Sequence, residues 1–131
     1  MLRYRVLVTA PSALVLVVED DADIREALTA LVEDCGLSVC AARDGVEGLA
    51  RLRAGPRPDA VFLDRWLPKL DGAALLATLK SDPTLAAIPV VWMSADPGCP
   101  EAAEMHLEKP FDVTALLEIL GSIRDRKPVL N

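Results

Sequence analysis

The 131-residue sequence has no excess of basic residues. Lysine and arginine number 14, against 20 aspartates and glutamates, so the net charge is −6 at pH 7. Proteins that bind nucleic acid need clustered basic side chains to meet phosphate groups, and the basic residues here are scattered along the chain. The composition therefore argues against nucleic-acid binding and against a DNA-binding output domain.

Cysteine is also scarce. Cys35, Cys40 and Cys99 are odd in number and form no CxxC pair. A disulfide framework needs paired cysteines, and a zinc site needs closely spaced ligands. We therefore expect reduced thiols in a protein of the cytoplasm.

No hydrophobic run is long enough to span a membrane. The basic segment MLRYR and the uncharged Val6–Val18 imitate a signal peptide, but Pro11 interrupts the run and acidic residues replace a cleavage site. We predict a buried strand at Leu14–Val18. Residues 1–12 are expected to form an N-terminal arm, in which Tyr4–Thr9 is an extra strand or an extension without a role, residues 13–126 one domain, and residues 127–131 a C-terminal tail.

Short apolar runs alternate with helical patterns along the rest of the chain. We predict strands at 14–18, 37–42, 59–64, 88–94 and 105–107, and helices at 21–36, 44–55, 72–80 and 113–124. The helices are expected to begin at acidic caps, namely Asp21 and Asp23 in the first, a capping box of Asp44 and Glu47, Asp71 and Asp112. One apolar face is predicted on the last helix, made by Val113, Leu116, Leu117, Leu120 and Ile123.

This alternation predicts a doubly wound α/β fold with a five-stranded parallel sheet, because each crossover helix returns the chain to the same end of the sheet. Between Ser94 and Lys109 the sequence offers only the short helical stretch PEAAE, at residues 100–104, before an edge strand. The fourth helix is therefore expected to be shortened or irregular. In such folds ligands bind at the carboxyl ends of the strands.

The predicted strand ends carry a coherent set of polar side chains. No glycine-rich turn follows the first strand, and an acidic turn repels phosphate, which argues against dinucleotide binding. Three converging carboxylates instead suit Mg²⁺, beside which a phosphoryl group can be accepted and its oxygens met by an ammonium and a hydroxyl. Taken alone, the serine is consistent with a plain strand end and the lysine with a solvated charge, but their joint placement favours a site. These residues are Glu19, Asp20, Asp64, Ser94 and Lys109.

Four motifs in order resemble the receiver domain of bacterial two-component response regulators, a CheY-like, flavodoxin-like family. The resemblance covers Leu14 to Arg124 and is carried by VLVVEDD, VFLDRWLPKLDG, PVVWMSA and EKPF. It implies that Asp64 accepts a phosphoryl group from a sensor histidine kinase or a histidine phosphotransfer protein, with no other enzymatic activity. It also implies a switch hydroxyl at Ser94, a counter-ion at Lys109 and a cis bond between Lys109 and Pro110.

The resemblance further implies a set of Mg²⁺ ligands, with the first acting through water: Glu19, Asp20, Asp64 and the backbone carbonyl of Trp66. The Trp66 side chain is either core filler or a partial shield over the acyl phosphate. His106 stands where the family carries an aromatic switch residue, and it is either a plain edge residue or an altered switch. With the short segment before it, His106 predicts a reshaped output face.

Two functions follow, and a third is weaker. The first is a phosphorylatable receiver, monomeric or weakly dimeric, that signals to a downstream protein partner by conformational change. The alternative is a receiver-fold interaction module that signals without phosphorylation. A metal-dependent phosphatase is disfavoured because Trp66 occupies the position of its usual second acid.

Overall fold

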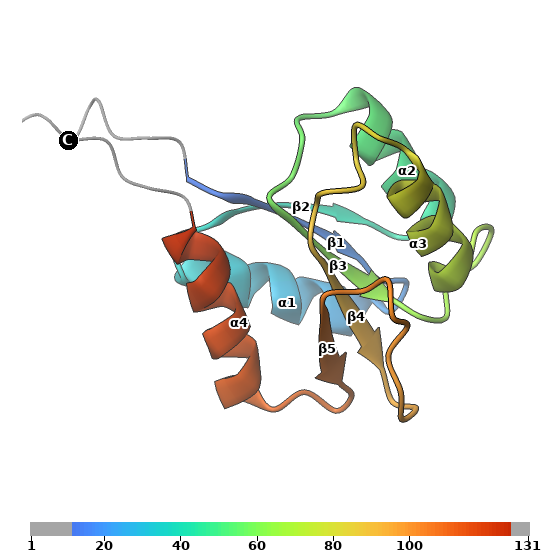
Figure 1. Ribbon diagram of the computed structural model, residues 1–131. Coiled ribbons are helices and arrows are strands. Elements are labelled where there is room, and N and C mark those ends of the chain that lie inside the picture. Colours follow the sequence, from blue (N-terminus) through green and yellow to red (C-terminus); the bar gives the residue numbers. More distant parts are fainter. Residues whose placement is uncertain (1–11, 127–131) are drawn as a thin grey trace, which may run out of the picture.

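The computed structural model describes residues 12–126 and consists of one parallel sheet covered by helices on both faces (Figure 1). The predicted arm at Tyr4–Thr9 and the tail at 127–131 lie outside the described residues. The strands run in the order β2-β1-β3-β4-β5. They are β1 (Leu14–Val18), β2 (Ser38–Ala42), β3 (Ala60–Asp64), β4 (Val90–Ser94) and β5 (Met105–Glu108), and the helices are α1 (Ala22–Asp34), α2 (Gly45–Ala54), α3 (Gly72–Ser81) and α4 (Val113–Asp125).

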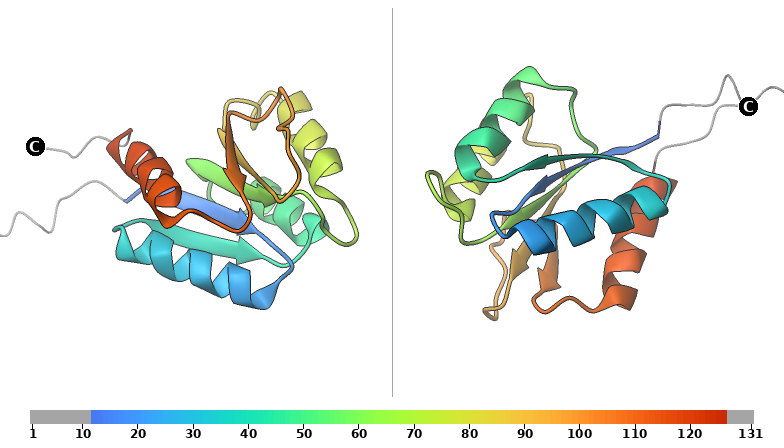
Figure 2. Two further views of the ribbon diagram at one scale, coloured as in Figure 1. Left: turned by 90° about the horizontal axis from the view of Figure 1, so that it is seen from below. Right: turned by 180° about the vertical axis from the view of Figure 1, so that it is seen from behind.

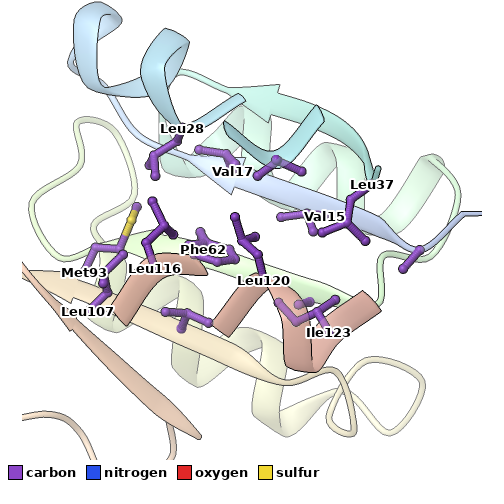
Figure 3. Packing of buried hydrophobic residues seen from close by; sticks show 14 residues of the cluster. Val15, Val17, Leu28, Leu37, Phe62, Met93, Leu107, Leu116, Leu120 and Ile123 are labelled. Carbon is purple, nitrogen blue, oxygen red and sulfur yellow. The ribbon is translucent and has the colours of Figure 1, made fainter. Parts of the chain in front are cut away.

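The two faces of the sheet form separate apolar layers. Side chains alternate along a strand, so Val15 and Val17 point to one face of β1 while Leu16 and Val18 point to the other. Helices α1 and α4 cover the first face and α2 and α3 the second (Figures 1 and 2). Phe62 of β3 lies in the first layer, between the strands and α4 (Figure 3). Because both faces are covered, the predicted doubly wound α/β fold is confirmed.

The predicted acidic caps are confirmed at all four helices. In each case the side chain of the cap residue accepts a hydrogen bond from a backbone N–H in the first turn, and these residues are Asp21, Asp44, Asp71 and Asp112. The reciprocal half of the capping box differs from the prediction, because the Glu47 carboxylate accepts from the backbone N–H of Arg43, at 2.6 Å. The four N-caps could be predicted from the sequence because an N-cap depends on local backbone geometry alone.

The connection from β4 to β5 contains no helix among its described residues. Where a short helical stretch was predicted, a single turn closes with the Ala103 N–H donating to the Pro100 carbonyl at 3.0 Å. Pro97, Gly98 with φ +95° and Pro100 interrupt any helical hydrogen-bond pattern. The shortening is therefore complete, and within residues 12–126 the sheet is covered by four helices.

A partly buried ion pair anchors this helix-free connection. The Lys80 ammonium at the end of α3 donates to both carboxylate oxygens of Glu104, at 2.8 and 3.1 Å, and to the backbone carbonyls of Ala86 and Ile88. Glu104 in turn accepts from the Val90 N–H at the start of β4. Only 18% of the Lys80 side chain is exposed, so these contacts are strengthened by partial burial.

Replacing Lys80 with methionine should therefore destabilise the fold. Lys80→Met keeps the apolar stem but removes the ammonium from two carbonyls and from Glu104, which retains the Val90 N–H, and we expect it to lower the free energy of unfolding by about 1–3 kcal/mol. Lys69→Met is the matched control, because the Lys69 side chain is 67% exposed and pairs with Asp44 at 3.5 Å. Urea denaturation of the two variants decides, and equal losses would contradict the anchoring role.

The predicted apolar face of α4 is narrower than the sequence suggested. Leu116, Leu120 and Ile123 are buried against the sheet, whereas Val113 is 54% and Leu117 is 42% exposed. At 100° per residue, these two positions lie on the shoulder of the apolar stripe and turn away from the strands.

The described residues also bear on membrane-spanning helices and on the state of the cysteines. Within residues 12–126, every helix is too short or too polar to cross a membrane. Cys35, Cys40 and Cys99 are all free thiols, in line with the predicted absence of a disulfide framework.

Candidate functional site

Four strand ends meet at one edge of the sheet. Glu19 follows β1 directly, Asp64 and Ser94 are the last residues of β3 and β4, and Lys109 follows β5. The strand order reverses between β1 and β3, because β2 lies on one side of β1 and β3 to β5 lie on the other. A crevice forms at such a reversal because successive crossovers leave on opposite faces of the sheet.

Three carboxylates lie together in this crevice. One oxygen from each of Glu19, Asp20 and Asp64 falls within 4.8 Å of the others. Glu19 and Asp64 are buried, with 1% and 4% exposure, while Asp20 is exposed. The surrounding cavity has a volume of about 320 Å³ and is also lined by Trp66, Ser94 and Lys109. Buried oxygen ligands beside an exposed one are the donor set that a hard divalent cation takes.

The ammonium of Lys109 bridges the two buried carboxylates. Its Nζ lies 2.7 Å from Glu19 Oε1 and 3.0 Å from Asp64 Oδ1. Burial by itself lowers the pKa of Lys109, but hydrogen bonds to Glu19 and Asp64 outweigh burial and raise this pKa above its usual value. Lys109 is therefore a fixed positive charge, and the Lys109–Pro110 bond after it is cis, as the resemblance implied.

One lysine does not fully compensate the buried acids. Burial raises the pKa of Glu19, and the charge of Asp64 adds to this effect, while the hydrogen bond from Lys109 opposes it. The pKa of Asp64 is likewise raised by burial against the pull of Lys109, with the charge of Asp20 raising it further. The site has carboxylates whose ionised forms are disfavoured, and an additional cation stabilises those forms.

The remaining predicted residues occupy different positions. Trp66 lines the opening with its side chain 64% exposed, so it is not core filler. Ser94 is buried, and its Oγ accepts a hydrogen bond from the Asp96 N–H at 2.9 Å. His106 lies on β5 opposite Trp92, outside the lining of the cavity. The His106 side chain is partly buried, and its Nε2 has no hydrogen-bond partner among the described residues.

Two residues of the site were not predicted. Arg65 directly follows Asp64, and its Nη1 lies 3.1 Å from Asp96 Oδ2 in the loop after β4. The Arg65 guanidinium also lies over the Trp66 ring, 4.5 Å from its centroid. No local pattern marks this pair, because the two residues meet only through the pairing of β3 with β4.

Comparisons with known proteins agree with this geometry. The model of the response regulator receiver domain family matches residues 15–121. The chain is 37% identical over 119 residues to the transcriptional regulatory protein CseB of Streptomyces coelicolor, covering 86% of this chain and 49% of that protein. It is 31% identical to the protein PilG of Pseudomonas aeruginosa, with 87% of both chains covered. The chain thus spans about half the length of CseB and most of PilG.

Solved structures show the same arrangement. The receiver domain of the Francisella response regulator 1452 superposes with a TM-score of 0.78 at 26% identity, over 88% of this chain and 99% of that one. The chemotaxis response regulator CheY4 of Vibrio cholerae gives a TM-score of 0.77 at 27% identity, over 86% and 98% of the two chains.

Proposed function

Because this chain belongs to the response regulator receiver domain family, we propose that it accepts a phosphoryl group on Asp64 from a phosphohistidine of a sensor histidine kinase or a histidine phosphotransfer protein. The observation that carries this proposal is the double contact of Lys109 with Glu19 and Asp64. It places a fixed positive charge directly beside the carboxylate oxygen that would be modified. Phosphoryl transfer depends mainly on such alignment and charge neutralisation.

Besides the phosphohistidine donor, the transfer step consumes only a proton from the solvent. An oxygen of the Asp64 carboxylate attacks phosphorus, a P–O bond forms, and the P–N bond to the donor imidazole breaks. The imidazole keeps the electron pair and takes up a proton. Lys109 then faces the phosphoryl oxygens, and the Ser94 hydroxyl, which also lines the cavity, is the second protein group assigned to them.

The acidic cluster fits a magnesium ion. Glu19, Asp20 and Asp64 would hold it together with the backbone carbonyl of Trp66, and Glu19 would act through water. When bound, Mg²⁺ supplies the positive charge that lets the carboxylates and a phosphoryl group share one cavity.

The proposed signal passes to a protein partner. The net charge of −6 disfavours binding to nucleic acid. We further propose a location in the cytoplasm and a monomeric or weakly dimeric state. The conformational change that follows phosphorylation would be read by a downstream protein.

Labelling with a small phosphodonor tests this function. The native protein incubated with acetyl phosphate and Mg²⁺ should gain one phosphoryl group, detectable by intact-mass spectrometry, and chelation of Mg²⁺ should prevent the gain. A native protein that stays unlabelled under conditions that label another receiver would contradict the proposal.

A phosphorylation-independent interaction module is the second candidate. The observation in its favour is the helix-free connection after β4, which Lys80 and Glu104 anchor, together with the partly buried imidazole of His106. Such a chain would bind its partner equally well with and without a phosphate mimic.

Magnesium should stabilise the fold in a pH-dependent way. The pKa values of Glu19 and Asp64 are raised in the fold above their ordinary values of 4.5 and 3.8, so the unfolded chain loses these protons at lower pH than the folded chain does. Without metal, the free energy of unfolding therefore falls as the pH rises from the ordinary pKa values to the raised ones. Mg²⁺ binds the ionised carboxylates, so its effect should vanish below this interval and be complete above it. At a hundred times its dissociation constant, it should add about 2.7 kcal/mol.

Melting curves with Mg²⁺ and with chelator, from about pH 4 to about pH 8, measure this effect. Asp20→Asn should reduce the magnesium-dependent shift, because it removes an exposed ligand oxygen. Asp23→Asn, which removes the same charge from the exposed first turn of α1, should retain the shift. A shift that is equal at both ends of the pH range would refute the assignment.

A further inference from the structure

A chain of contacts links the proposed phosphoacceptor to the switch hydroxyl. Arg65 is covalently next to Asp64 and forms an ion pair, at 3.1 Å, with Asp96, which lines the cavity. The Arg65 guanidinium lies over the Trp66 ring. This contact already restricts the Arg65 side chain, so forming the ion pair with Asp96 costs less conformational entropy. The loops after β3 and β4 are therefore tied together beside the reacting carboxylate.

Asp96 also controls the Ser94 hydroxyl. The Asp96 N–H donates to Ser94 Oγ at 2.9 Å, and the Ser94 O–H is directed to the Asp96 carbonyl, at 3.5 Å. Within residues 12–126, both hydrogen-bond partners of this hydroxyl are thus backbone atoms of Asp96. Ser94 is only 2% exposed, so most of its surface is covered by protein.

Donation to a phosphoryl group requires a different arrangement of this turn. The Ser94 O–H must leave the Asp96 carbonyl and point toward Asp64, and any approach of Ser94 Oγ to Asp64 also stretches its hydrogen bond from the Asp96 N–H. A ligand that requires the rearranged turn must break any interaction that exists only in the original arrangement. The affinity for this ligand is therefore lowered by the free energy of the lost interaction.

We propose that the Arg65–Asp96 ion pair is a latch that holds the Ser94 hydroxyl away from Asp64 and weakens phosphoryl binding. This inference rests on the proposed function, and Arg65 is a positioning residue that acts through Asp96. Both side chains are more than a third exposed, at 37% and 50%, so the latch is weak. Exposed ion pairs of this kind correspond to a change in affinity of up to about fivefold.

Binding of beryllium fluoride in excess Mg²⁺, measured by calorimetry, tests the latch. Arg65→Gln and Asp96→Asn should each tighten binding about two- to fivefold. Arg65→Gln also removes a positive charge near the anion, and Asp96→Asn removes a negative one. The double variant separates these charge effects from the loss of the ion pair. The double variant should show a coupling between the two sites, because the second substitution has no ion pair left to break. Additive effects would overturn the proposal.

Amide hydrogen exchange in the unliganded protein supplies the second readout. Exchange of the Asp96 N–H should accelerate in Arg65→Gln by a similar factor, because the turn opens more often. Arg43→Gln is the matched control, since Arg43 pairs with Glu47 on another part of the surface and should leave this amide unchanged.

Failure of the latch and failure of the proposed function give different experimental results. Unchanged Asp96 exchange, or faster exchange without tighter binding, overturns the latch while normal binding by the native protein leaves the proposed function intact. If the native protein does not bind beryllium fluoride, both the latch and the proposed function are contradicted.

Discussion

Asp64→Asn is expected to reduce labelling by a small phosphodonor to background. The amide has no anionic oxygen that can attack phosphorus, and Asp64 is the carboxylate that ends β3 beside the Lys109 ammonium, at 3.0 Å. Intact-mass spectrometry after incubation with acetyl phosphate and Mg²⁺ measures the loss.

Unfolding should not account for this loss. Burial disfavours the ionised form of Asp64 and raises its pKa, so a neutral amide removes a desolvated charge. Lys109 keeps Glu19 as its partner, at 2.7 Å. Circular dichroism and the melting temperature of Asp64→Asn should therefore resemble those of the native protein measured without metal.

Asp71→Asn is the matched control for the chemistry. Asp71 lies seven residues further along the chain and caps α3 by accepting from the Ala74 N–H at 2.9 Å, a role that asparagine also fills. Asp71→Asn should keep full labelling. Persistent labelling of Asp64→Asn would assign the phosphoacceptor to another carboxylate.

Gly72→Ala should strongly destabilise the fold. A Cβ at Gly72 would overlap the carbonyl oxygen of Asp64 and lie 2.8 Å from the carbonyl oxygen of Arg65. Both atoms belong to the backbone, so relief requires the loop after β3 to move. We expect a loss of about 3 kcal/mol, at the upper end of the range for overpacking, together with weaker Mg²⁺ binding because Asp64 is displaced.

Gly121→Ala, in α4, should have the opposite effect on stability. A Cβ there meets only the end of the flexible Arg124 side chain, at 3.7 Å. Since alanine favours a helix over glycine by about 1 kcal/mol, Gly121→Ala should stabilise the fold. Urea denaturation compares the two variants, and a Gly72→Ala protein as stable as the native one would show that the loop after β3 is not tightly packed.

Several features of this protein were determined by the sequence alone. Apolar runs that end in Glu19, Asp20 and Asp64 identify strands with acids at their carboxyl ends, and the parallel connection then places those acids at one edge. The helix caps are also local, because a carboxylate such as Asp44 or Asp71 reaches backbone N–H groups two or three residues away. These predictions depend on short-range geometry and on the periodicity of apolar residues.

Tertiary structure decided the contacts between strands and the extent of each buried face. Arg65 meets Asp96, and Lys80 meets Glu104, only because β3, β4 and the end of α3 lie side by side. The exposure of Leu117 likewise depends on how α4 is rotated against the sheet. Side chains far apart in sequence have no shared periodic signal, so their pairing is set by the packing of the whole domain.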